Sequence, residues 1–337
     1  MNSAYVLLLF LLTASACATS PTPPQPLTHD GPVRTHGSLH TKGNKIVGSD
    51  EQPVSLAGVS YGWSQWEAAR FYNAGVVNWL KKDWNTTIIR AALGIKPEGY
   101  LGHPEREKAR VCEVIDAAIA ADLYVIIDWH DHDANQHTEL AVTFFQEMAR
   151  KYGQSPNVIY EIFNEPKKGL TWSQDVKPYA EKVIAAIRAI DPDNLIVVGT
   201  PNWSQDVDLA AADPIKDPNL AYTLHFYAGS HKQKLRDKAV VALNLGTPLF
   251  VTEWGTCDAS GAGGFDPAST EDWMKFMRKW DLSHCNWGIY DKAETACIVH
   301  RSASSKGNWT DKDLTESGRL AREWVRGWSA QKIATSK

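Results

Sequence analysis

Residues 123–130 read LYVIIDWH, a continuous apolar run that ends in ionisable side chains. An apolar run without polar alternation is typical of a strand that is covered on both faces, as in a parallel sheet. Asp128 and His130 follow the run directly, although buried strands normally exclude such groups. The segment therefore indicates both a parallel sheet and a site at the carboxyl ends of its strands.

Similar runs, rich in β-branched and aromatic residues, recur about 25–37 residues apart. The predicted strands are 54–61, 86–93, 123–130, 158–165, 195–201, 220–227, 248–255 and 284–291. Apolar residues at helical spacing lie between most of them, as in 66–84, 104–121 and 178–190. This alternation predicts an α/β fold, a (β/α)8 TIM barrel in a single domain over residues 36–331. A doubly wound sheet is the alternative, which the lack of a glycine-rich turn after the first strand disfavours.

The amino-terminal segment is typical of a secretory signal peptide. Residues 1–16 carry no charged side chain, and the apolar run 6–12 is followed by Ala14-Ser15-Ala16, a small-residue cleavage signal. We therefore expect a secreted, extracellular protein. Cys17, directly after this signal, leaves open a lipid anchor as an alternative. No other segment is apolar enough to span a membrane.

Three further segments flank or close the predicted barrel. Residues 17–35 are rich in Pro, Thr and Ser and are expected to form a flexible linker. Residues 36–53 contain two glycine turns and are expected to form a hairpin that closes the barrel floor. Residues 332–337 are expected to be a short carboxyl-terminal tail.

Four cysteines follow Cys17 in the chain. In a secreted protein they allow up to two disulfides. Cys285 and Cys297 flank one loop and are the expected pair, with buried free thiols as the alternative. The chain has no C-x-x-C spacing, so a structural zinc site is not expected.

The composition is ordinary for a globular protein, with 43% hydrophobic and 22% charged residues and a net charge of −4. This charge disfavours a broad nucleic-acid-binding surface. The 14 tryptophans are unusual. Those in helical patterns are expected to pack in the core, whereas Trp129 and Trp254 neighbour ionisable residues and are expected to wall the site.

Polar side chains gather at one end of nearly every predicted strand. They are Arg90, Asp128, His130, Asn164, Glu165, His225, Tyr227, Glu253, Asn286 and Trp287. Because active sites of such barrels lie at the carboxyl ends of the strands, we expect these side chains to form one site. Glu165 and Glu253 end strands on opposite sides of the mouth and can flank a bond, which is the arrangement that glycoside hydrolysis requires.

The other polar residues suit such a pair of carboxyl groups. A nucleophilic carboxylate must stay ionised, whereas a general acid must hold a proton. Arg90 would favour the ionised form of a carboxylate that it reached, and Tyr227 is able to donate a hydrogen bond to the same group. His130, Asn164 and His225 offer donors and acceptors for sugar hydroxyls.

The segment His130-Asp131-His132-Asp133, with His137, has an alternative interpretation as a metal site. Imidazole and carboxylate ligands suit zinc or iron. We favour the simpler hypothesis that His130 binds sugar and that His132 and Asp133 fix the loop by hydrogen bonds. No metal and no cofactor are therefore expected.

Four motifs, taken in order, resemble the endoglucanases of glycoside hydrolase family 5, and most of all its bacterial-type cellulase branch. They are DWHDH at 128–132, VIYEIFNEP at 158–166, YTLHFY at 222–227 and VTEWG at 251–255. The resemblance extends from about residue 54 to about residue 295 and is weakest at 296–308, where changes in the far glycone subsites are expected.

The resemblance implies retaining hydrolysis of β-1,4-glucan and cello-oligosaccharides. We expect the protein to be a monomer. Glu165 matches the general acid/base and Glu253 the nucleophile. The residues that match supporting positions around the scissile sugar are Arg90, His130, Asn164, His225, Tyr227 and Trp287. Lys292 and Glu294 match sugar contacts in the glycone subsites, Trp66 resembles a stacking platform there, and Trp203 resembles one on the aglycone side. A retaining pair predicts a carboxyl separation of about 5 Å, against about 8 Å for an inverting pair.

Other functions remain open from sequence. Related barrel glycosidases act on mannan, xyloglucan or mixed-linkage glucan, and residue types alone do not separate these substrates. A non-catalytic glucan-binding barrel is a further alternative. It is disfavoured because Glu165, Glu253 and Arg90 are all present.

Overall fold

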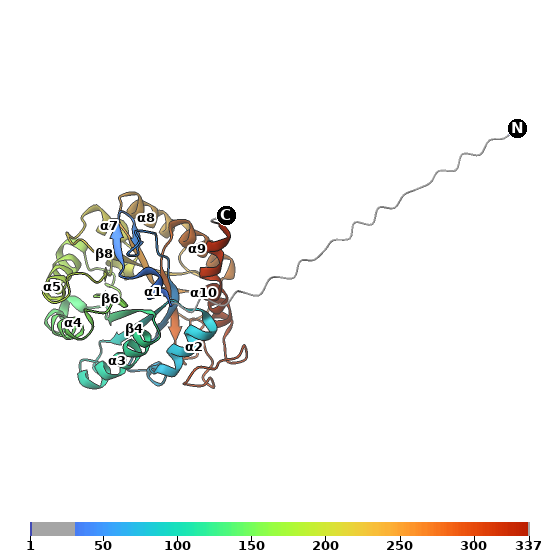
Figure 1. The fold of residues 1–337 in the computed structure, drawn as a ribbon, viewed down its shortest axis with the longest axis horizontal. Helices are drawn as coiled ribbons and strands as arrows, with labels where there is room; N and C mark the ends of the chain where they lie inside the picture. The colour runs from blue at the N-terminus through green and yellow to red at the C-terminus, as the bar shows by residue number, and fades with distance from the viewer. Residues whose placement is uncertain (2–30, 336–337) are drawn as a thin grey trace.

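The computed structural model describes Met1 and residues 31–335, apart from the side chains from residue 330 onward. Eight parallel strands form a closed barrel in the order β10-β3-β4-β5-β6-β7-β8-β9, and helices surround it (Figure 1). The strands are β3 (Ala57–Tyr61), β4 (Ile88–Gly94), β5 (Tyr124–His130), β6 (Val158–Glu161), β7 (Ile196–Val198), β8 (Leu220–Tyr227), β9 (Leu249–Gly255) and β10 (His284–Ile289). The predicted (β/α)8 barrel is confirmed, and each predicted strand overlaps an observed one.

The long helices cover the outside of the barrel with their apolar faces. They are α2 (Ala74–Trp84), α3 (Pro104–Ala120), α4 (Thr138–Tyr152), α5 (Lys177–Arg188), α8 (Gln233–Asn244), α9 (Pro267–Trp280) and α10 (Glu316–Thr335). Shorter ones, η1 (Ala69–Phe71), η2 (Ala134–Gln136), η3 (Trp172–Val176), α6 (Pro201–Ser204) and α7 (Val207–Ala212), lie in the connections. The start of α2 shows how a local signal sets a boundary, because the Asn73 side chain accepts a hydrogen bond from the Val76 amide.

The predicted hairpin forms from β1 (His40–Lys42) and β2 (Lys45–Val47), which pair antiparallel. Leu39 and Ile46 belong to the same buried cluster as the lower interior of the barrel, so the hairpin closes that end. A short helix, α1 (Pro32–His36), precedes it and buries Val33 in this cluster. The folded part therefore includes residues that were expected to belong to the linker. At the other end, α10 continues to Thr335, past the expected boundary.

Inside the barrel, the side chains change from apolar at the floor to polar at the mouth. On β5, Tyr124 and Ile126 lie in the lower apolar cluster, and the next inward residues are Asp128 and His130. Successive side chains of a strand point to opposite faces, so the intervening Trp129 packs outside the barrel. The same alternation places the polar ends of the other strands in one layer beneath the mouth.

The expectation that Trp129 and Trp254 wall the site is wrong. Trp129 packs edge-to-face against Tyr100 with ring centroids 5.3 Å apart, and Trp254 stacks on Phe226 at 6.0 Å. The Trp254 indole N–H donates to the Nδ1 atom of His284 at 3.0 Å. Both indoles follow an inward-facing carboxylate and therefore point out toward the helices.

The expected disulfide between Cys285 and Cys297 is also wrong, because the four described cysteines are free thiols, all buried except the partly exposed Cys112. Cys285 lies on β10 in the lower interior cluster of the barrel. Cys297 belongs to the other apolar cluster, and its Sγ atom lies 3.0 Å from the backbone oxygen of Val299. The two side chains are thus buried in separate clusters.

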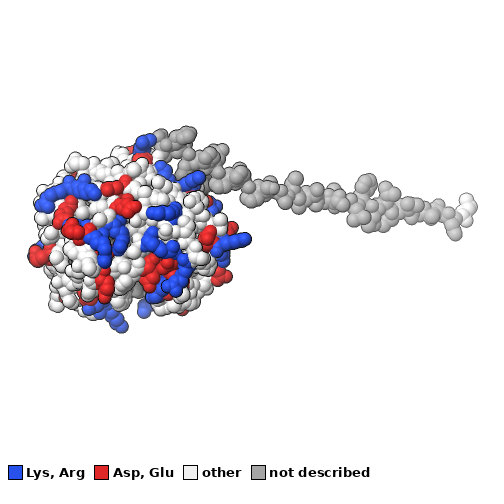
Figure 2. Space-filling view, turned by 90° about the horizontal axis from the view of Figure 1, so that it is seen from below, with Lys and Arg blue, Asp and Glu red and all other residues white. Residues whose placement is uncertain are grey.

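Lys and Arg side chains alternate with Asp and Glu over the face shown in Figure 2, without one extended region of a single sign. The interspersed charges agree with the small net charge of −4. Among residues 31–335, no helix has the length and apolar character that a membrane span requires.

Candidate active site

Arg90 occupies the centre of the polar layer and is completely buried. Its guanidinium contacts three carboxylates: Glu161 at 2.7 Å, Asp128 at 3.0 Å and Glu253 at 3.1 Å. Burial opposes the positive charge, but the carboxylates outweigh it and raise the pKa of Arg90 well above its ordinary value. A buried carboxylate needs such a partner, so Arg90 holds the acidic side chains of β5, β6 and β9 in one cluster.

The roles of Asp128 and Glu161 were missed from sequence. A usable signal was present, because Glu161 falls inside an apolar predicted strand and a buried carboxylate requires a cation. Arg90 is the only Lys or Arg in the eight predicted strands, so it was the available partner. Both oxygens of Glu161 accept hydrogen bonds from Arg90, at 2.7 and 3.2 Å.

Glu253 is oriented through both of its oxygens. Its Oε1 atom accepts a hydrogen bond from the Tyr227 hydroxyl at 2.7 Å, and its Oε2 atom accepts one from Arg90 at 3.1 Å. Burial raises the pKa of Glu253 and the nearby Glu165 carboxylate adds to this, whereas His225, Arg90 and Tyr227 act in the opposite direction. The two donors fix the carboxyl group and stabilise its ionised form, as a nucleophile requires.

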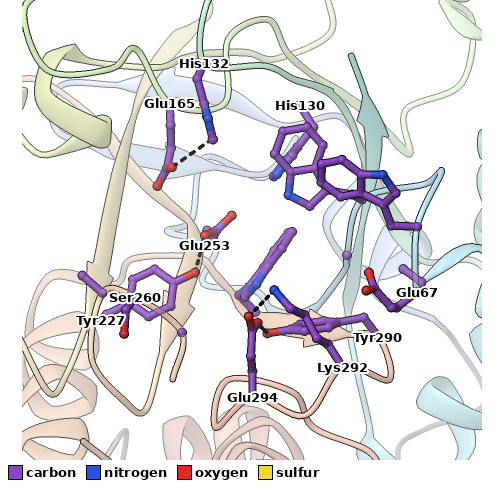
Figure 3. Close-up of a pocket in the computed structure, with 17 residues that line it drawn as sticks. Glu67, His130, His132, Glu165, Tyr227, Glu253, Ser260, Tyr290, Lys292 and Glu294 are labelled. Carbon is purple, nitrogen blue, oxygen red and sulfur yellow. Dashed lines mark hydrogen bonds and ion pairs between the residues drawn. The ribbon is translucent and has the colours of Figure 1, made fainter. Parts of the chain in front are cut away.

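Glu165 faces Glu253 across the open space in Figure 3, and its side chain is 15% exposed. Its Oε1 atom lies 2.9 Å from Nδ1 of His225, and its Oε2 atom lies 3.5 Å from Nε2 of His132. One carboxylate oxygen of Glu165 and one of Glu253 lie within 4.8 Å of each other. This spacing agrees with the value of about 5 Å that characterises a retaining pair.

Asn164 and His130 present polar atoms beside the two carboxyl groups. Asn164 accepts a hydrogen bond from Arg90 at 2.6 Å, and its buried Nδ2 atom has no protein partner among the described residues. His130 contacts Asp128 through Nδ1 at 2.7 Å and stacks on Trp287 with ring centroids 5.0 Å apart. Burial, reinforced by Arg90, lowers the pKa of His130 well below its ordinary value and so favours the neutral ring.

A cleft of about 290 Å³ opens on one side of the carboxyl pair. Its walls include the three residues predicted for the glycone side, Trp66, Lys292 and Glu294, together with Trp287, which was predicted beside the scissile sugar. Trp66 is 43% exposed, as a stacking platform for a sugar ring must be. Lys292 forms an ion pair with Glu294, which also accepts a hydrogen bond from Tyr290 at 3.3 Å (Figure 3). Trp63, Glu67, Ser260 and Tyr290 also line this cleft and were not predicted.

A second cleft of about 290 Å³ lies on the other side and shares Glu165 and Tyr227 with the first. It contains Trp203, whereas Trp66 lines the first cleft. Trp203 is 36% exposed, and residues 202–204 all have left-handed backbone, with φ of 62° at Trp203. Such backbone is unfavourable for these residue types, and the Trp203 amide is held by the Pro166 carbonyl at 2.8 Å. The indole is therefore presented to the cleft by a strained turn.

Glu165, His225 and Glu253 form a group whose ligand atoms are close enough to surround a metal ion. Each of the three also has hydrogen-bond partners within the protein. Burial opposes a charge on His225, but the surrounding carboxylates raise its pKa to about 9, whereas a metal-binding imidazole must be neutral. Both oxygens of Glu253 already accept hydrogen bonds.

The residues of the segment that had the alternative interpretation as a metal site also pair with other side chains. His137 pairs with Asp131 at 2.6 Å, and Asp133 pairs with Lys167. We expected His132 to fix its own loop by hydrogen bonds. Its side chain instead lies toward Glu165. His132 is therefore a further residue of the carboxyl site.

A family model described as cellulase (glycosyl hydrolase family 5) matches residues 47–293. The chain belongs to glycosyl hydrolase family 5. Endoglucanase Z of Dickeya dadantii is 52% identical over 293 residues, which cover 86% of this chain and 66% of that protein. An endoglucanase of Clostridium saccharobutylicum is 44% identical, with 86% of this chain and 65% of that protein covered. The chain thus spans about two thirds of the length of these relatives.

Solved structures of similar proteins agree with the family 5 assignment. One from Cytophaga hutchinsonii is 50% identical with a TM-score of 0.88 and covers 91% of this chain and 100% of that one. The catalytic domain of Thermobifida fusca endoglucanase Cel5A is 32% identical with a TM-score of 0.84, covering 88% and 99%. A variant of the Thermobifida fusca domain was solved in complex with cellotetraose, with a TM-score of 0.83.

The position of Arg90 predicts a pH-dependent loss of stability in Arg90→Met. Removing the guanidinium leaves Asp128, Glu161 and Glu253 buried without their cation, so we expect a loss of about 3–5 kcal/mol in the free energy of unfolding at pH 7.5. The unpaired carboxyl groups would have raised pKa values, and protonation at acid pH relieves their repulsion. The loss should therefore be smaller at pH 5.

Urea denaturation of wild type and Arg90→Met at both pH values measures this effect. Lys275→Met is the control, because Lys275 pairs with Glu271 on an exposed helix face and should show little change at either pH. Equal losses for Arg90→Met at pH 5 and pH 7.5 would contradict the central role of Arg90.

Proposed function

We propose that this chain is an endo-β-1,4-glucanase that hydrolyses cellulose-type glucan with retention of configuration. The observation that carries the proposal is the Glu165–Glu253 pair, with oxygens within 4.8 Å of each other at the junction of two clefts. The endoglucanase names of the relatives and the cellotetraose bound by the Thermobifida fusca domain support this substrate class.

In the first step, Glu253 attacks the anomeric carbon while Glu165 donates its proton to the departing glycosidic oxygen. The bond to that oxygen breaks, and a covalent glycosyl–enzyme forms on Glu253. Arg90 and Tyr227 hold the attacking carboxylate in place before the reaction. Glu165, the more exposed carboxyl group, stands at the boundary between the clefts, where the leaving oxygen must lie.

In the second step, the ionised Glu165 removes a proton from water, which attacks the same anomeric carbon and releases Glu253. Two inversions give net retention. The aromatic faces of Trp66 and Trp203 suit pyranose rings on opposite sides of the cleaved bond. The Lys292–Glu294 pair offers polar contacts to sugar hydroxyls on the glycone side.

The two glutamates predict different products when each is replaced and azide is added. Glu253→Ala loses the nucleophile, so azide attacks an activated cellobioside directly and yields the α-glycosyl azide. Glu165→Ala still forms the covalent intermediate with an activated leaving group, and azide then yields the β-glycosyl azide. Each variant should lose at least about 10³-fold in kcat on glucan without azide. Product NMR checks the outcome, and the same azide anomer from both variants would refute the assignment.

The substrate preference is tested with a panel of carboxymethylcellulose, lichenan, glucomannan, mannan and xylan, with EDTA in every assay. We expect the highest kcat/KM on β-1,4-glucan, because the similar proteins are named endoglucanases and a similar catalytic domain was solved in complex with cellotetraose. Strong activity on mannan with none on cellulose would overturn the proposed substrate. Activity that EDTA abolishes and zinc restores would overturn the prediction that no metal is needed.

We also propose that the protein is secreted as a monomer. Secretion is supported by residues 1–16, most of which lie outside the described residues. Amino-terminal analysis of the expressed protein should find cleavage next to Cys17, either free in the medium or lipid-modified in the membrane fraction. Recovery of the protein with Met1 retained in the cytosol would contradict secretion.

Light scattering measures the oligomeric state, and the mass of one chain is expected for a monomer.

A further inference from the structure

A chain of hydrogen bonds extends from Glu165 into the barrel, away from the clefts. His225 contacts Glu165 through Nδ1 at 2.9 Å and the Thr252 hydroxyl through Nε2 at 2.8 Å. The same hydroxyl contacts the Oε1 atom of Glu161 at 2.6 Å. Thr252 and Glu161 are fully buried, and His225 is nearly so. Water therefore cannot replace the contact of Thr252 with either partner.

The chemistry of the partners fixes the direction of these bonds. Glu161 is held ionised by two bonds from Arg90, and Arg90 and His225 lower its pKa although burial opposes them, so it only accepts. The single hydroxyl proton of Thr252 must then be donated to Glu161. The hydroxyl oxygen can only accept from His225, which places a proton on Nε2 whether the imidazole is neutral or charged.

We propose that Thr252 is a positioning residue, which keeps a proton on Nε2 of His225. A second proton is shared between Nδ1 of His225 and Glu165, and it is the proton delivered to the leaving oxygen. With Nε2 protonated, the Glu165–His225 pair retains this shared proton. The inference rests on the proposed glucanase function. It assigns Thr252 no contact with substrate, because Thr252 acts through His225.

The reason is electrostatic. With Nε2 protonated, loss of the shared proton would leave the Nδ1 lone pair facing the Glu165 carboxylate at 2.9 Å, which is repulsive. Without the Thr252 hydroxyl, a neutral His225 is free to move its proton to Nδ1 and donate it to Glu165. The deprotonated pair is then less unfavourable, and the shared proton is lost at lower pH.

The other charged groups around His225 are the same whether residue 252 is threonine or valine. Glu161, Glu165 and Glu253 face it from β6, the following loop and β9. Asp128, His130 and His231 also lie within electrostatic reach, and Arg90 is bonded to several of the same groups. The Oε1 atom of Glu161 lies 3.8 Å from Nε2, too far to replace the hydroxyl as a hydrogen-bond acceptor.

The test compares wild type, Thr252→Val and Thr252→Ser by the pH dependence of kcat/KM on cellotetraose. Valine keeps the shape but removes the hydroxyl, so we expect the basic limb to move about one pH unit lower. Serine restores the hydroxyl and should restore the wild-type limb. A basic limb that is identical in wild type and Thr252→Val, or one that serine fails to restore, would overturn the proposal.

Dinitrophenyl β-cellobioside is the matched control substrate. Its leaving group departs without protonation, so the basic limb of kcat/KM should be the same in wild type and Thr252→Val. A loss of the same size on both substrates at all pH values would show a merely structural role and would overturn the proposal.

Nitrogen-15 NMR of His225 in the wild-type protein tests the tautomer without any variant or activity. We expect Nε2 to stay protonated on both sides of the imidazole titration, and Thr252→Val to move the neutral proton to Nδ1. A neutral wild-type imidazole that is protonated on Nδ1 would overturn the proposal. Because this measurement needs no turnover, it separates a failure of the Thr252 assignment from a failure of the proposed function.

Discussion

The buried guanidinium of Arg90 is the interaction on which the rest of the site depends. Three carboxylates from three strands converge on it within 2.7–3.1 Å. Without a cation these groups would repel one another in a region that excludes water, and the polar layer could not stay closed. The apolar floor formed by residues such as Ile126 and Ile159 stabilises the barrel beneath this layer. The barrel thus combines a conventional core with a charged layer held by one side chain.

The two glutamates differ because their surroundings differ. Glu253 accepts hydrogen bonds through both oxygens and lies against Arg90, which suits an ionised nucleophile. Glu165 contacts two imidazoles and lies where the clefts meet, which suits a group that gives up and recovers a proton. Thr252 and Glu161 extend this second environment into the barrel. Acid, base and nucleophile roles are therefore set by neighbours rather than by residue type.

Some features follow from local patterns and were predictable. Runs such as 123–130 specify buried strands, and the residues at their carboxyl ends must share the mouth of a barrel. The outward orientation of Trp129 was missed although strand alternation dictates it. The Cys285–Cys297 pair was wrong for a different reason. Proximity along the chain does not show which apolar cluster each thiol enters.

By itself, the sequence determined the barrel, the order of its strands and the identity of the polar residues at its mouth, because periodicity and strand ends are local properties. Only the tertiary structure decided which side chains meet. The Arg90 cluster, the contact of His132 with Glu165 and the bonds of Thr252 all join residues from different strands or from the loops that follow them. Such contacts depend on strand register and barrel closure, which bring together groups that are far apart along the chain.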